Sequence, residues 1–549
     1  SRSSELGDCP PEVASRERHG GFMRDMELFE NSFFSISAAE ASAMDPQQRQ
    51  LLERGYSALH ASGMTKSTLM GSLLAVNVGQ WSSEFGSVLR SMPAGRSVYA
   101  ATGYSCSVTC GRVSFALGLH GPCASFDTAC SSSLVASHSS LRALQRVECD
   151  MALSAGVNMM LDPLMMRTNA TAGFTSIKGR SHTFDARADG YARGEAIDVV
   201  VCRLRGESAT GPTEMLGSAI RQDGRSASLT APNGQAQQGM LAASLSDGRL
   251  RPEQAAMIEA HGTGTALGDP IEAGALAAVF LSQRGRDVVP LAVGSLKANA
   301  GHTEPGAGLA GALKLATQLQ RATMPSNAQL RVLNPHVRVA LGDGAACGLP
   351  TQVESLSAPD AHHLCGGVSS FGYSGTIAHT VLRYAAADSG GSASSTARPP
   401  LAYRRRAFPW RDEPHPFLQR QLPPLADGTL VFRSPTAGVL RSLVADHVVQ
   451  SSVIFPGAGY LELARAAACV ATSSTSAAVL RGVFFLQPLA VDTPGLHVEC
   501  SVSGGSFEIR SGDVGADGVL AEAEAHCSGS FASTSLGAWQ RVDHASMRS

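Results

Sequence analysis

The chain has 549 residues, 44% of them hydrophobic, and a formal net charge of −2. Its length leaves room for two to four domains at roughly 150 residues each, and its hydrophobic content excludes a wholly disordered protein. The balanced charge and the 5% aromatic content argue against a nucleic-acid-binding surface. We find no run of about 18 apolar residues and therefore expect no membrane span. The 12 scattered cysteines predict reduced thiols in an intracellular compartment.

The chain divides at residues 385–400, which are small, polar and without apolar periodicity, as is typical of a linker. Before this stretch, short apolar runs alternate with helical segments, and this alternation predicts α/β layers. After it, the composition favours more strands. The strand candidates are residues 151–157, 198–204, 255–260, 291–296, 452–455 and 483–485.

Two helices are expected to follow strand candidates in the first region. The first begins near Cys130, and one of its faces carries Leu134, Leu141 and Leu144. The second begins near Pro305, a residue type that suits a first helical turn, and one of its faces carries Leu309, Leu313 and Ala316.

Cys130 lies in the sequence Asp-Thr-Ala-Cys-Ser-Ser-Ser, directly before the first of these helices. The positive end of a helix dipole lowers a thiol pKa from about 8.5 toward the thiolate range. Small neighbours permit a sharp turn and access for a substrate. A buried structural cysteine is the competing interpretation, but it does not account for four hydroxyl-bearing neighbours.

Two histidines occupy similar glycine-rich turns. His261 follows an apolar strand in Glu-Ala-His-Gly-Thr-Gly-Thr, and His302 ends the run Lys-Ala-Asn-Ala-Gly-His. A lone histidine is usually a structural or surface residue, whereas one thiol and two imidazoles in such turns suit acyl transfer. The cysteine spacing fits no structural zinc site, so we predict no metal site. The sequence also lacks a phosphate-binding glycine motif.

On these residues, positions 1–384 resemble the β-ketoacyl synthase (ketosynthase) domain of type I polyketide synthases. The matching stretches occur in family order across the whole region. They are residues 44–53, 121–134, 149–158, 183–195, 223–238, 259–276, 294–308 and 367–382.

The resemblance implies a thiolase-like fold of stacked α/β layers, usually dimeric, and a decarboxylative Claisen condensation. It implies that Cys130 accepts the acyl group and that His261 and His302 promote decarboxylation of a malonyl-type extender. Lys297 matches the lysine that supports the second histidine. The main-chain N–H groups of Cys130 and Tyr373 match the oxyanion hole, and Tyr373 stands where a phenylalanine is more usual.

The sequence departs from the family pattern at several places without losing a catalytic group. Ile377 replaces a usual asparagine, and residues 196–198 break a commoner glycine run. The opening strand of the family would precede Ser1, so we expect the chain to come from the inside of a longer protein.

Residues 415–549 resemble the N-terminal half of a polyketide synthase dehydratase, which implies an α+β hot-dog fold and one half of a double hot dog. His447 and Pro456 match the motif His-x3-Gly-x4-Pro, while Ser451 replaces its glycine. The resemblance implies that His447 is the base that takes the α-proton of a β-hydroxyacyl thioester. The catalytic aspartate of the second half is not in the chain, so we expect little dehydratase activity from it alone.

Residues 385–414 form the expected linker, in which the run Arg404–Arg406 is predicted to pack back on the ketosynthase. No acyltransferase domain fits there, so the resemblance implies an acyltransferase in trans. It also implies an acyl carrier protein that brings substrates on 4′-phosphopantetheine, with no cofactor bound to this chain. Two alternatives stay open, a non-condensing ketosynthase that only transfers acyl chains and an inactive scaffold fragment.

Overall fold

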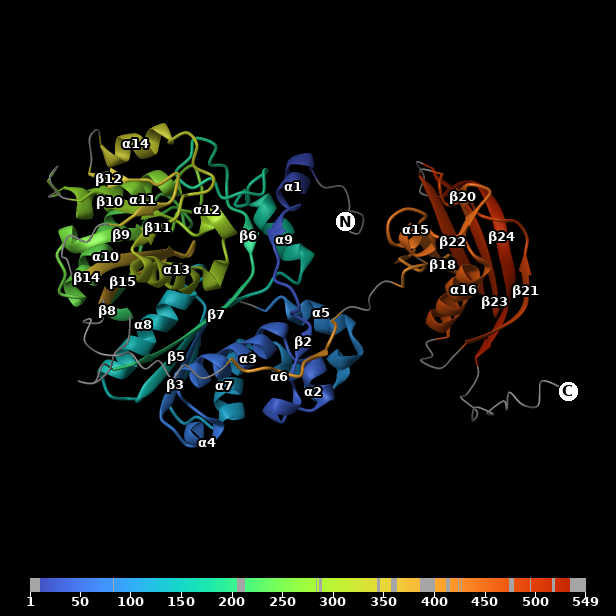
Figure 1. Cartoon of the computed structure of the whole chain (residues 1–549), viewed down its shortest axis with the longest axis horizontal. Coiled ribbons are helices and arrows are strands. Elements are labelled where there is room, and N and C mark those ends of the chain that lie inside the picture. Colours follow the sequence, from blue (N-terminus) through green and yellow to red (C-terminus); the bar gives the residue numbers. More distant parts are fainter. Residues whose placement is uncertain are drawn as a thin grey trace. The chain divides into compact units, whose positions relative to one another are not determined.

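A computed structural model of the chain describes residues 10–533. The exceptions are residues 82, 205–212, 283, 286–288, 343–345, 357–362, 386–399, 411–414, 423, 426, 473–477, 494 and 516–518. The chain forms two compact units, Ser1–Trp410 and Arg411–Ser549 (Figure 1). Most of the predicted linker, residues 386–399, lies outside the described residues.

One half of the first unit is built on a four-stranded sheet. In spatial order its strands are β4 (Cys123–Phe126), β3 (Leu74–Gly79), β5 (Met151–Asn158) and β7 (Ala196–Arg203). Strand β3 is parallel to β4 and β5, and β7 is antiparallel to β5. One face packs against α8 (Ser132–Gln145), and the other packs against α3 (Pro46–Ala61) and α7 (Cys106–Leu117).

The other half is built on a six-stranded sheet. In spatial order its strands are β12 (Cys347–Gly348), β10 (Leu291–Gly294), β9 (Ala255–Glu259), β14 (His363–Phe371), β15 (Thr376–Ala385) and β8 (Thr213–Gln222). Helix α13 (Ala307–Arg321) covers one face, and α10 (Gly234–Asp247) and α11 (Gly268–Leu276) cover the other. Helices α8 and α13 also contact each other. The unit is therefore layered helix, sheet, helix, sheet, helix (Figure 1), as the sequence predicted.

The strand candidates at 151–157, 198–204, 255–260 and 291–296 are confirmed as β5, β7, β9 and β10. The first predicted helix is α8, which buries Leu134 and Leu144. The second starts with a 3-10 turn at Glu304–Gly306 before α13. Of the residues at helical spacing in α13, Leu309 is buried, whereas Leu313 is 38% exposed. Between the two sheets, α13 instead buries residues on both sides of Leu309, together with Leu315 and Leu319.

Shorter elements connect these layers. They are α1 (Pro11–Arg16), β1 (Gly20–Gly21), β2 (Leu28–Phe29), α2 (Ala38–Ala43), α4 (Lys66–Leu69), α5 (Phe85–Ser91), α6 (Ala100–Gly103), α9 (Pro163–Thr171), β6 (Arg193–Gly194), α12 (Lys297–Ala300), β11 (Thr323–Met324), α14 (Pro335–Leu341), β13 (Glu354–Ser355) and β16 (Arg406–Ala407).

Residues 401–410 pack on the first unit, as expected for the arginine run. Strand β16 pairs with β2, and the Arg405 guanidinium lies 2.8 Å from the carboxylate of Glu53. The Arg49 side chain donates to the carbonyl oxygen of Phe408 at 2.9 Å. This segment therefore belongs structurally to the ketosynthase-like unit, which runs through Trp410.

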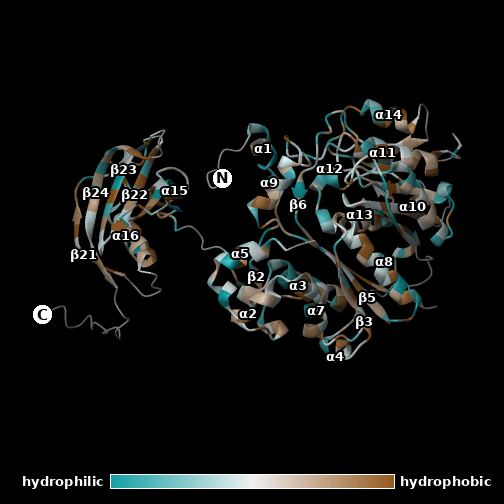
Figure 2. Cartoon of the chain, turned by 180° about the vertical axis from the view of Figure 1, so that it is seen from behind, coloured by the Kyte–Doolittle hydropathy of each residue, from teal (hydrophilic) through white to brown (hydrophobic). Residues whose placement is uncertain are grey.

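The second unit wraps an antiparallel sheet around one long helix. In spatial order the strands are β17 (Arg420–Gln421), β18 (Leu430–Pro435), β22 (Leu496–Ser503), β23 (Ser506–Val514), β24 (Leu520–Ser533) and β21 (Ala478–Phe485). Buried residues alternate with exposed or half-buried ones along β22 and β23, which gives these strands their banded colours in Figure 2. The buried faces pack on α16 (Gly457–Ala471) in the hydrophobic core.

The strand expected at 452–455 is shorter than predicted. Only Ser452–Val453 forms a strand (β20), paired with β19 (Val448–Val449) in a small hairpin beside α15 (Val439–Val444). The candidate at 483–485 is confirmed within β21. Among the helices in the described ranges, none combines the length and the hydrophobicity that crossing a bilayer requires.

Candidate active site

Cys130 sits at the turn that joins β4 to α8. Ala129, directly before it, has φ 55°, a left-handed conformation that makes the turn sharp. Gly79 of β3 lets the start of α8 approach the sheet, because a Cβ there would lie 2.4 Å from the main-chain nitrogen of Ser133. The thiol is thus fixed at the end of a buried helix and is 7% exposed.

His302 is in direct contact with this thiol. Its Nε2 lies 3.1 Å from the sulfur of Cys130, and its Nδ1 accepts a hydrogen bond from the main-chain N–H of Glu304 at 3.1 Å. A ring nitrogen that accepts a hydrogen bond carries no proton, so the neutral ring holds its proton on Nε2. His302 therefore presents an N–H donor to the sulfur.

His261 has the same arrangement. Its Nδ1 accepts from the main-chain N–H of Phe371 at 3.2 Å, which leaves its proton on Nε2. The two imidazole rings are perpendicular, with centroids 5.6 Å apart. The Glu272 carboxylate accepts from the main-chain N–H groups of His261 (2.7 Å) and Gly262 (2.8 Å) and fixes this turn.

Both imidazoles are held neutral. Burial lowers the pKa of His261 and of His302 well below the usual histidine value, and the positive charge of Lys297 lowers both further. Lys297 is itself buried, which lowers its own pKa, while the carboxylates of Glu259 and Glu272 act in the opposite direction. Burial therefore keeps the two rings uncharged, and the positive charge of Lys297 adds to this effect.

The thiol of Cys130 does not behave as its place before a helix predicted. Burial raises its pKa to about 12, and the charge of Glu304 adds to this. Lys297 and the main-chain N–H groups of Tyr373 and Cys130 lower the pKa, but by less. The predicted shift toward thiolate is wrong because complete desolvation of the sulfur outweighs the helix end.

Tyr373 contributes its main chain and its side chain differently. Its main-chain N–H, like that of Cys130 itself, lowers the pKa of the Cys130 thiol. Its ring is 50% exposed and packs on Phe174 with centroids 6.1 Å apart. Tyr373 therefore acts on the thiol through its main chain and lines the cavity with its side chain.

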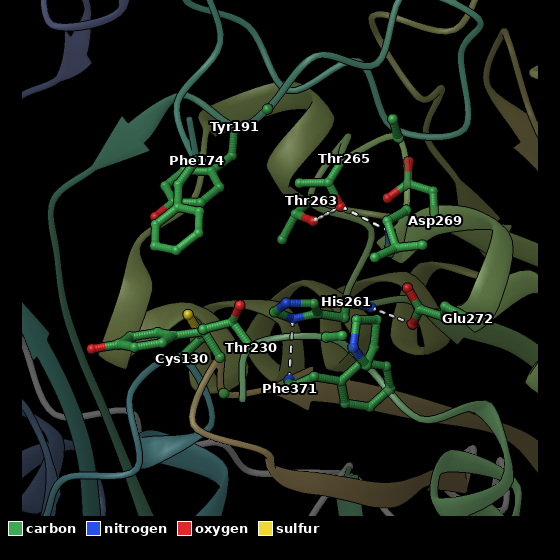
Figure 3. A pocket seen from close by; sticks show the side chains of 18 of the residues that line it. Cys130, Phe174, Tyr191, Thr230, His261, Thr263, Thr265, Asp269, Glu272 and Phe371 are labelled. Carbon is green, nitrogen blue, oxygen red and sulfur yellow. Dashed lines mark hydrogen bonds between the residues drawn. The ribbon is translucent and has the colours of Figure 1, made fainter. Parts of the chain in front are cut away.

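These groups open into one cavity of about 440 Å³. Figure 3 shows Cys130 and His261 on one side of it, and Phe174 and Tyr191 across from them. Hydroxyl-bearing side chains also line it, namely Ser228, Thr230, Thr263 and Thr265. The structure thus brings Cys130, His261 and His302 to one cavity, with Lys297 buried behind it.

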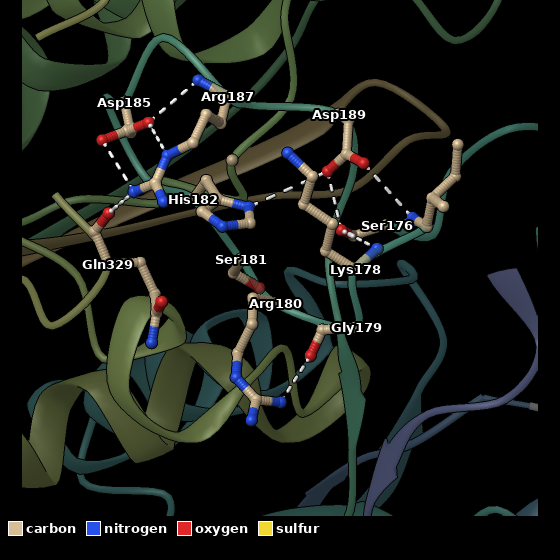
Figure 4. A network of polar contacts seen from close by, with 12 residues as sticks. Ser176, Lys178, Gly179, Arg180, Ser181, His182, Asp185, Arg187, Asp189 and Gln329 are labelled. Carbon is tan, nitrogen blue, oxygen red and sulfur yellow. Dashed lines mark hydrogen bonds and ion pairs between the residues drawn. The ribbon is translucent and has the colours of Figure 1, made fainter. Parts of the chain in front are cut away.

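The wall that carries Tyr191 is fixed by a polar network in residues 176–189 (Figure 4). Asp189 accepts from Ser176 at 2.6 Å, and Asp185 pairs with Arg187 at 2.7 Å. Although burial opposes ionisation of Asp185, donors from Arg187 and from the main chain hold its pKa below the usual value. This wall is therefore rigidly held beside the cavity.

The sequence analysis did not single out three buried carboxylates that organise the site. Glu272 fixes the His261 turn, Asp269 accepts from the main-chain N–H groups of Phe184 and Gly264, and Glu304 lies behind His302. All three are within stretches that matched the family. The sequence feature that could have indicated them is a charged residue within an otherwise apolar or glycine-rich stretch.

His447 lies in the second unit, at the base of the β19–β20 hairpin. Its Nδ1 donates to the carbonyl oxygen of Ile454 at 2.7 Å, so Nε2 is the ring nitrogen without a hydrogen atom in the neutral side chain. The turn residues Gln450 and Ser451 have φ 50° and 71°. Such values favour glycine, which explains the glycine that the motif has where this chain has Ser451.

Comparisons with known proteins agree with this architecture. Residues 2–205 match the "Beta-ketoacyl synthase, N-terminal domain" and residues 213–331 the "Beta-ketoacyl synthase, C-terminal domain". Residues 415–512 match the "Polyketide synthase dehydratase domain". The chain belongs to the polyketide synthase family. It combines a ketosynthase domain with the N-terminal part of a dehydratase domain.

Two curated polyketide synthase relatives illustrate the match, and both are components of the phenolphthiocerol/phthiocerol polyketide synthase of Mycobacterium tuberculosis. The chain is 40% identical to one of them over 381 residues, covering 68% of this chain and 20% of that protein. It is 41% identical to the other over 367 residues, covering 66% of this chain and 23% of that protein. The chain therefore spans about a fifth of the length of the curated relatives it matches.

Solved ketosynthase structures share the fold of the first unit. The ketosynthase from module 6 of the bacillaene synthase of Bacillus subtilis 168 is 33% identical, with a TM-score of 0.61 over 67% of this chain and 63% of that chain. An oxazolomycin ketosynthase domain of Streptomyces albus JA3453 is 28% identical, with a TM-score of 0.62 over 67% of this chain and 64% of that chain. The predicted thiolase-like layers are confirmed, and ketosynthase domains of polyketide synthases are condensing enzymes.

Proposed function

We propose that this chain is an acyltransferase of the 3-oxoacyl synthase type, which joins an acyl group on Cys130 to a malonyl-type extender. The observation that carries the proposal is the contact of one buried thiol with His302, beside a second neutral imidazole, His261. One nucleophile and two N–H donors in one enclosed cavity suit a reaction with two successive oxyanions.

In the first step, the sulfur of Cys130 attacks the carbonyl carbon of an incoming acyl thioester. The N–H groups of Cys130 and Tyr373 stabilise the oxyanion of the tetrahedral intermediate. The carrier thiolate leaves and takes up the proton that the Cys130 thiol has lost. Lys297 assists because its charge lowers the pKa of that thiol.

In the second step, the extender thioester loses CO₂ and the electron pair passes into its thioester carbonyl as an enolate. The Nε2–H groups of His261 and His302 donate to the enolate oxygen, and neutral donors suit this because they need not lose a proton. The enolate carbon then attacks the acyl carbonyl on Cys130. The Cys130 thiolate leaves, and a 3-oxoacyl thioester remains on the carrier.

We propose an acyl carrier protein with a 4′-phosphopantetheine arm as the substrate carrier. The hydroxyl groups of Thr263, Thr265 and Thr230 that line the cavity are suited to an amide-bearing arm. In the sequence, the second compact unit begins at Arg411, directly after the first ends at Trp410, so no acyltransferase domain lies between them, and we propose that an acyltransferase acts in trans. Within the described residues, strand β4 pairs with β3 only, and this free edge supports a homodimer.

The experiment supplies the whole chain with an acyl thioester and then with a malonyl carrier thioester, and follows acylation of Cys130 and CO₂ release by mass. Acylation followed by CO₂ release and a 3-oxoacyl product is the expected result. Acylation without CO₂ release would favour an enzyme that only transfers acyl groups. The absence of both would favour a scaffold.

A second function is proposed for the dehydratase part, with His447 as the base that takes an α-proton. Its unprotonated Nε2, oriented by the Nδ1 contact with Ile454, supports this role. We expect loss of water from a 3-hydroxyacyl carrier thioester to be slow with this chain, because no acid partner has been assigned. His447→Ala should abolish what turnover there is; turnover that survives the substitution would exclude His447 as the base.

A further inference from the structure

A buried ionic cluster lies directly behind His302. The guanidinium of Arg193 contacts both carboxylate oxygens of Glu304, at 2.6 and 2.9 Å, and one oxygen of Glu84 at 3.0 Å. All three side chains are 0–2% exposed. Asn158 adds a donor to Glu304 at 3.0 Å. Both carboxylates are thus held in place by fixed donors rather than by water.

The same cluster holds the main chain of His302. Its N–H donates to the carbonyl oxygen of Ala192 at 2.7 Å, and its carbonyl oxygen accepts from Gly194 at 2.8 Å. These residues flank Arg193. Asn158 joins the two parts, since its amide also donates to the carbonyl oxygen of Gly194 at 2.7 Å. The segment that supplies the guanidinium therefore also fixes the backbone of His302.

Glu304 has a left-handed backbone, with φ 50°. This conformation is unfavourable for a residue with a side chain and persists only where the surroundings hold it. It lets one residue direct its N–H to Nδ1 of His302 and its carboxylate to Arg193. Its carboxylate is bound by Arg193 and Asn158, and its N–H by His302.

We propose that Glu304, anchored by Arg193, is a positioning residue that fixes His302 in the tautomer with its proton on Nε2. Without the N–H of Glu304 at Nδ1, the ring can carry its proton on either nitrogen or turn away from the sulfur. In the other tautomer, Nε2 is an acceptor and repels an enolate oxygen. This role rests on the proposed condensation, in which the Nε2–H group of His302 is one of the two donors to the enolate oxygen.

The test compares Glu304→Ala and the isosteric Glu304→Gln with the matched control Glu84→Gln. Glu84 is also a buried partner of Arg193, but among the described residues it shares no hydrogen bond with His302. Two quantities are measured in the whole chain, CO₂ release from a malonyl carrier thioester and the His302 tautomer. The tautomer is determined from ¹⁵N shifts of labelled histidine, with the His302 signal assigned by its loss in His302→Ala.

We expect Glu304→Ala to slow CO₂ release at least tenfold, and more than Glu304→Gln does, and to shift His302 away from the Nε2–H tautomer. Glu84→Gln should stay within about threefold of the wild type and keep the tautomer. Wild-type tautomer and CO₂ release in Glu304→Ala would overturn the proposal. Slow CO₂ release with an unchanged tautomer would overturn it as well.

If Glu304→Ala fails to fold, as judged by loss of the cooperative urea unfolding transition, the isosteric Glu304→Gln decides by the same two criteria. The tautomer measurement is independent of turnover. A wild-type chain that releases no CO₂ would contradict the proposed function, whereas the tautomer of the Glu304 variants would still decide the positioning role.

Discussion

The Nε2 atom of His302 lies 3.1 Å from the sulfur of Cys130, while Nδ1 of the same ring accepts the main-chain N–H of Glu304. The histidine therefore faces the thiol as a donor and not as a base. In the proposed condensation, such a donor stabilises the negative charge on the enolate oxygen that forms during decarboxylation. In the proposed reaction, decarboxylation therefore requires the His302 donor, whereas acyl loading does not.

Cys130→Ala should abolish acyl-enzyme formation without loss of the fold, because the side chain is the nucleophile and alanine fits the same small space. Intact-mass measurement after incubation with an acyl thioester checks this. Cys110→Ala, which removes another buried thiol, is the matched control and should still be acylated. An acyl adduct on the Cys130→Ala protein would contradict the assignment.

His302→Ala should still load an acyl group on Cys130 but lose condensation. Loading needs the thiol and two main-chain N–H groups, whereas decarboxylation also needs the enolate donors, and loss of one such donor typically costs about 10²–10³ in rate. His120→Ala, at an exposed position, serves as the control. Condensation at the wild-type rate in His302→Ala would show that this role is wrong.

Alkylation of Cys130 by iodoacetamide should accelerate with pH. With a thiol pKa of about 12, the thiolate fraction rises about tenfold per pH unit between pH 6 and 9. Lys297→Met removes a charge that lowers this pKa, so its alkylation should be slower at each pH. A rate that levels off near pH 7 would instead indicate a thiol with a low pKa, as the helix end alone predicts.

Asp198→Asn should stabilise the protein at alkaline pH. Burial raises the pKa of Asp198 to about 7, and its Oδ2 has no hydrogen-bond partner within the described ranges. Because the folded pKa lies above the unfolded one, the folded state binds more protons, and stability falls as pH rises from about 4 to 7. A tenfold difference in proton affinity between the folded and unfolded states corresponds to about 1.4 kcal/mol.

Urea unfolding at pH 5 and pH 8 checks this expectation. Asp198→Asn should gain about 1–4 kcal/mol over the wild type at pH 8 and much less at pH 5. Asp150→Asn, at an exposed position, should show no such difference. An equal effect of Asp198→Asn at the two pH values would mean that the carboxylate does not titrate as described.

Ser451→Gly should stabilise the second unit by about 0.5–1 kcal/mol, because Ser451 has φ 71° and glycine adopts this conformation without steric cost. The free energy of unfolding from urea titration is the measurement. Ser442→Gly, inside helix α15, should have the opposite sign. A loss of stability in Ser451→Gly would mean that its side chain makes a contact outweighing the strain.

The sequence by itself determined the kind of fold and predicted the principal reacting groups of the proposed condensation. Cys130, His261 and His302 each lie in a short turn of small residues after a strand or before a helix, and such local patterns survive in the sequence. Parallel strands β9, β10 and β14 end at one edge, so the turns after them had to meet. The local helical repeat of apolar residues likewise predicted that Leu134 and Leu144 share one face of α8, where both are buried.

Only the tertiary structure decided the protonation of these groups and the residues that control it. Burial of Cys130 reverses the effect of the helix end on its pKa, and burial depends on the packing of both sheets. The tautomer of His302 depends on Glu304, whose carboxylate is bound by Arg193, 111 residues away along the chain. Leu313, which the helical repeat placed with Leu309, is exposed because the layers around α13 select another face. Desolvation and long-range ion pairs arise from contacts between distant segments, and no local pattern in the sequence records them.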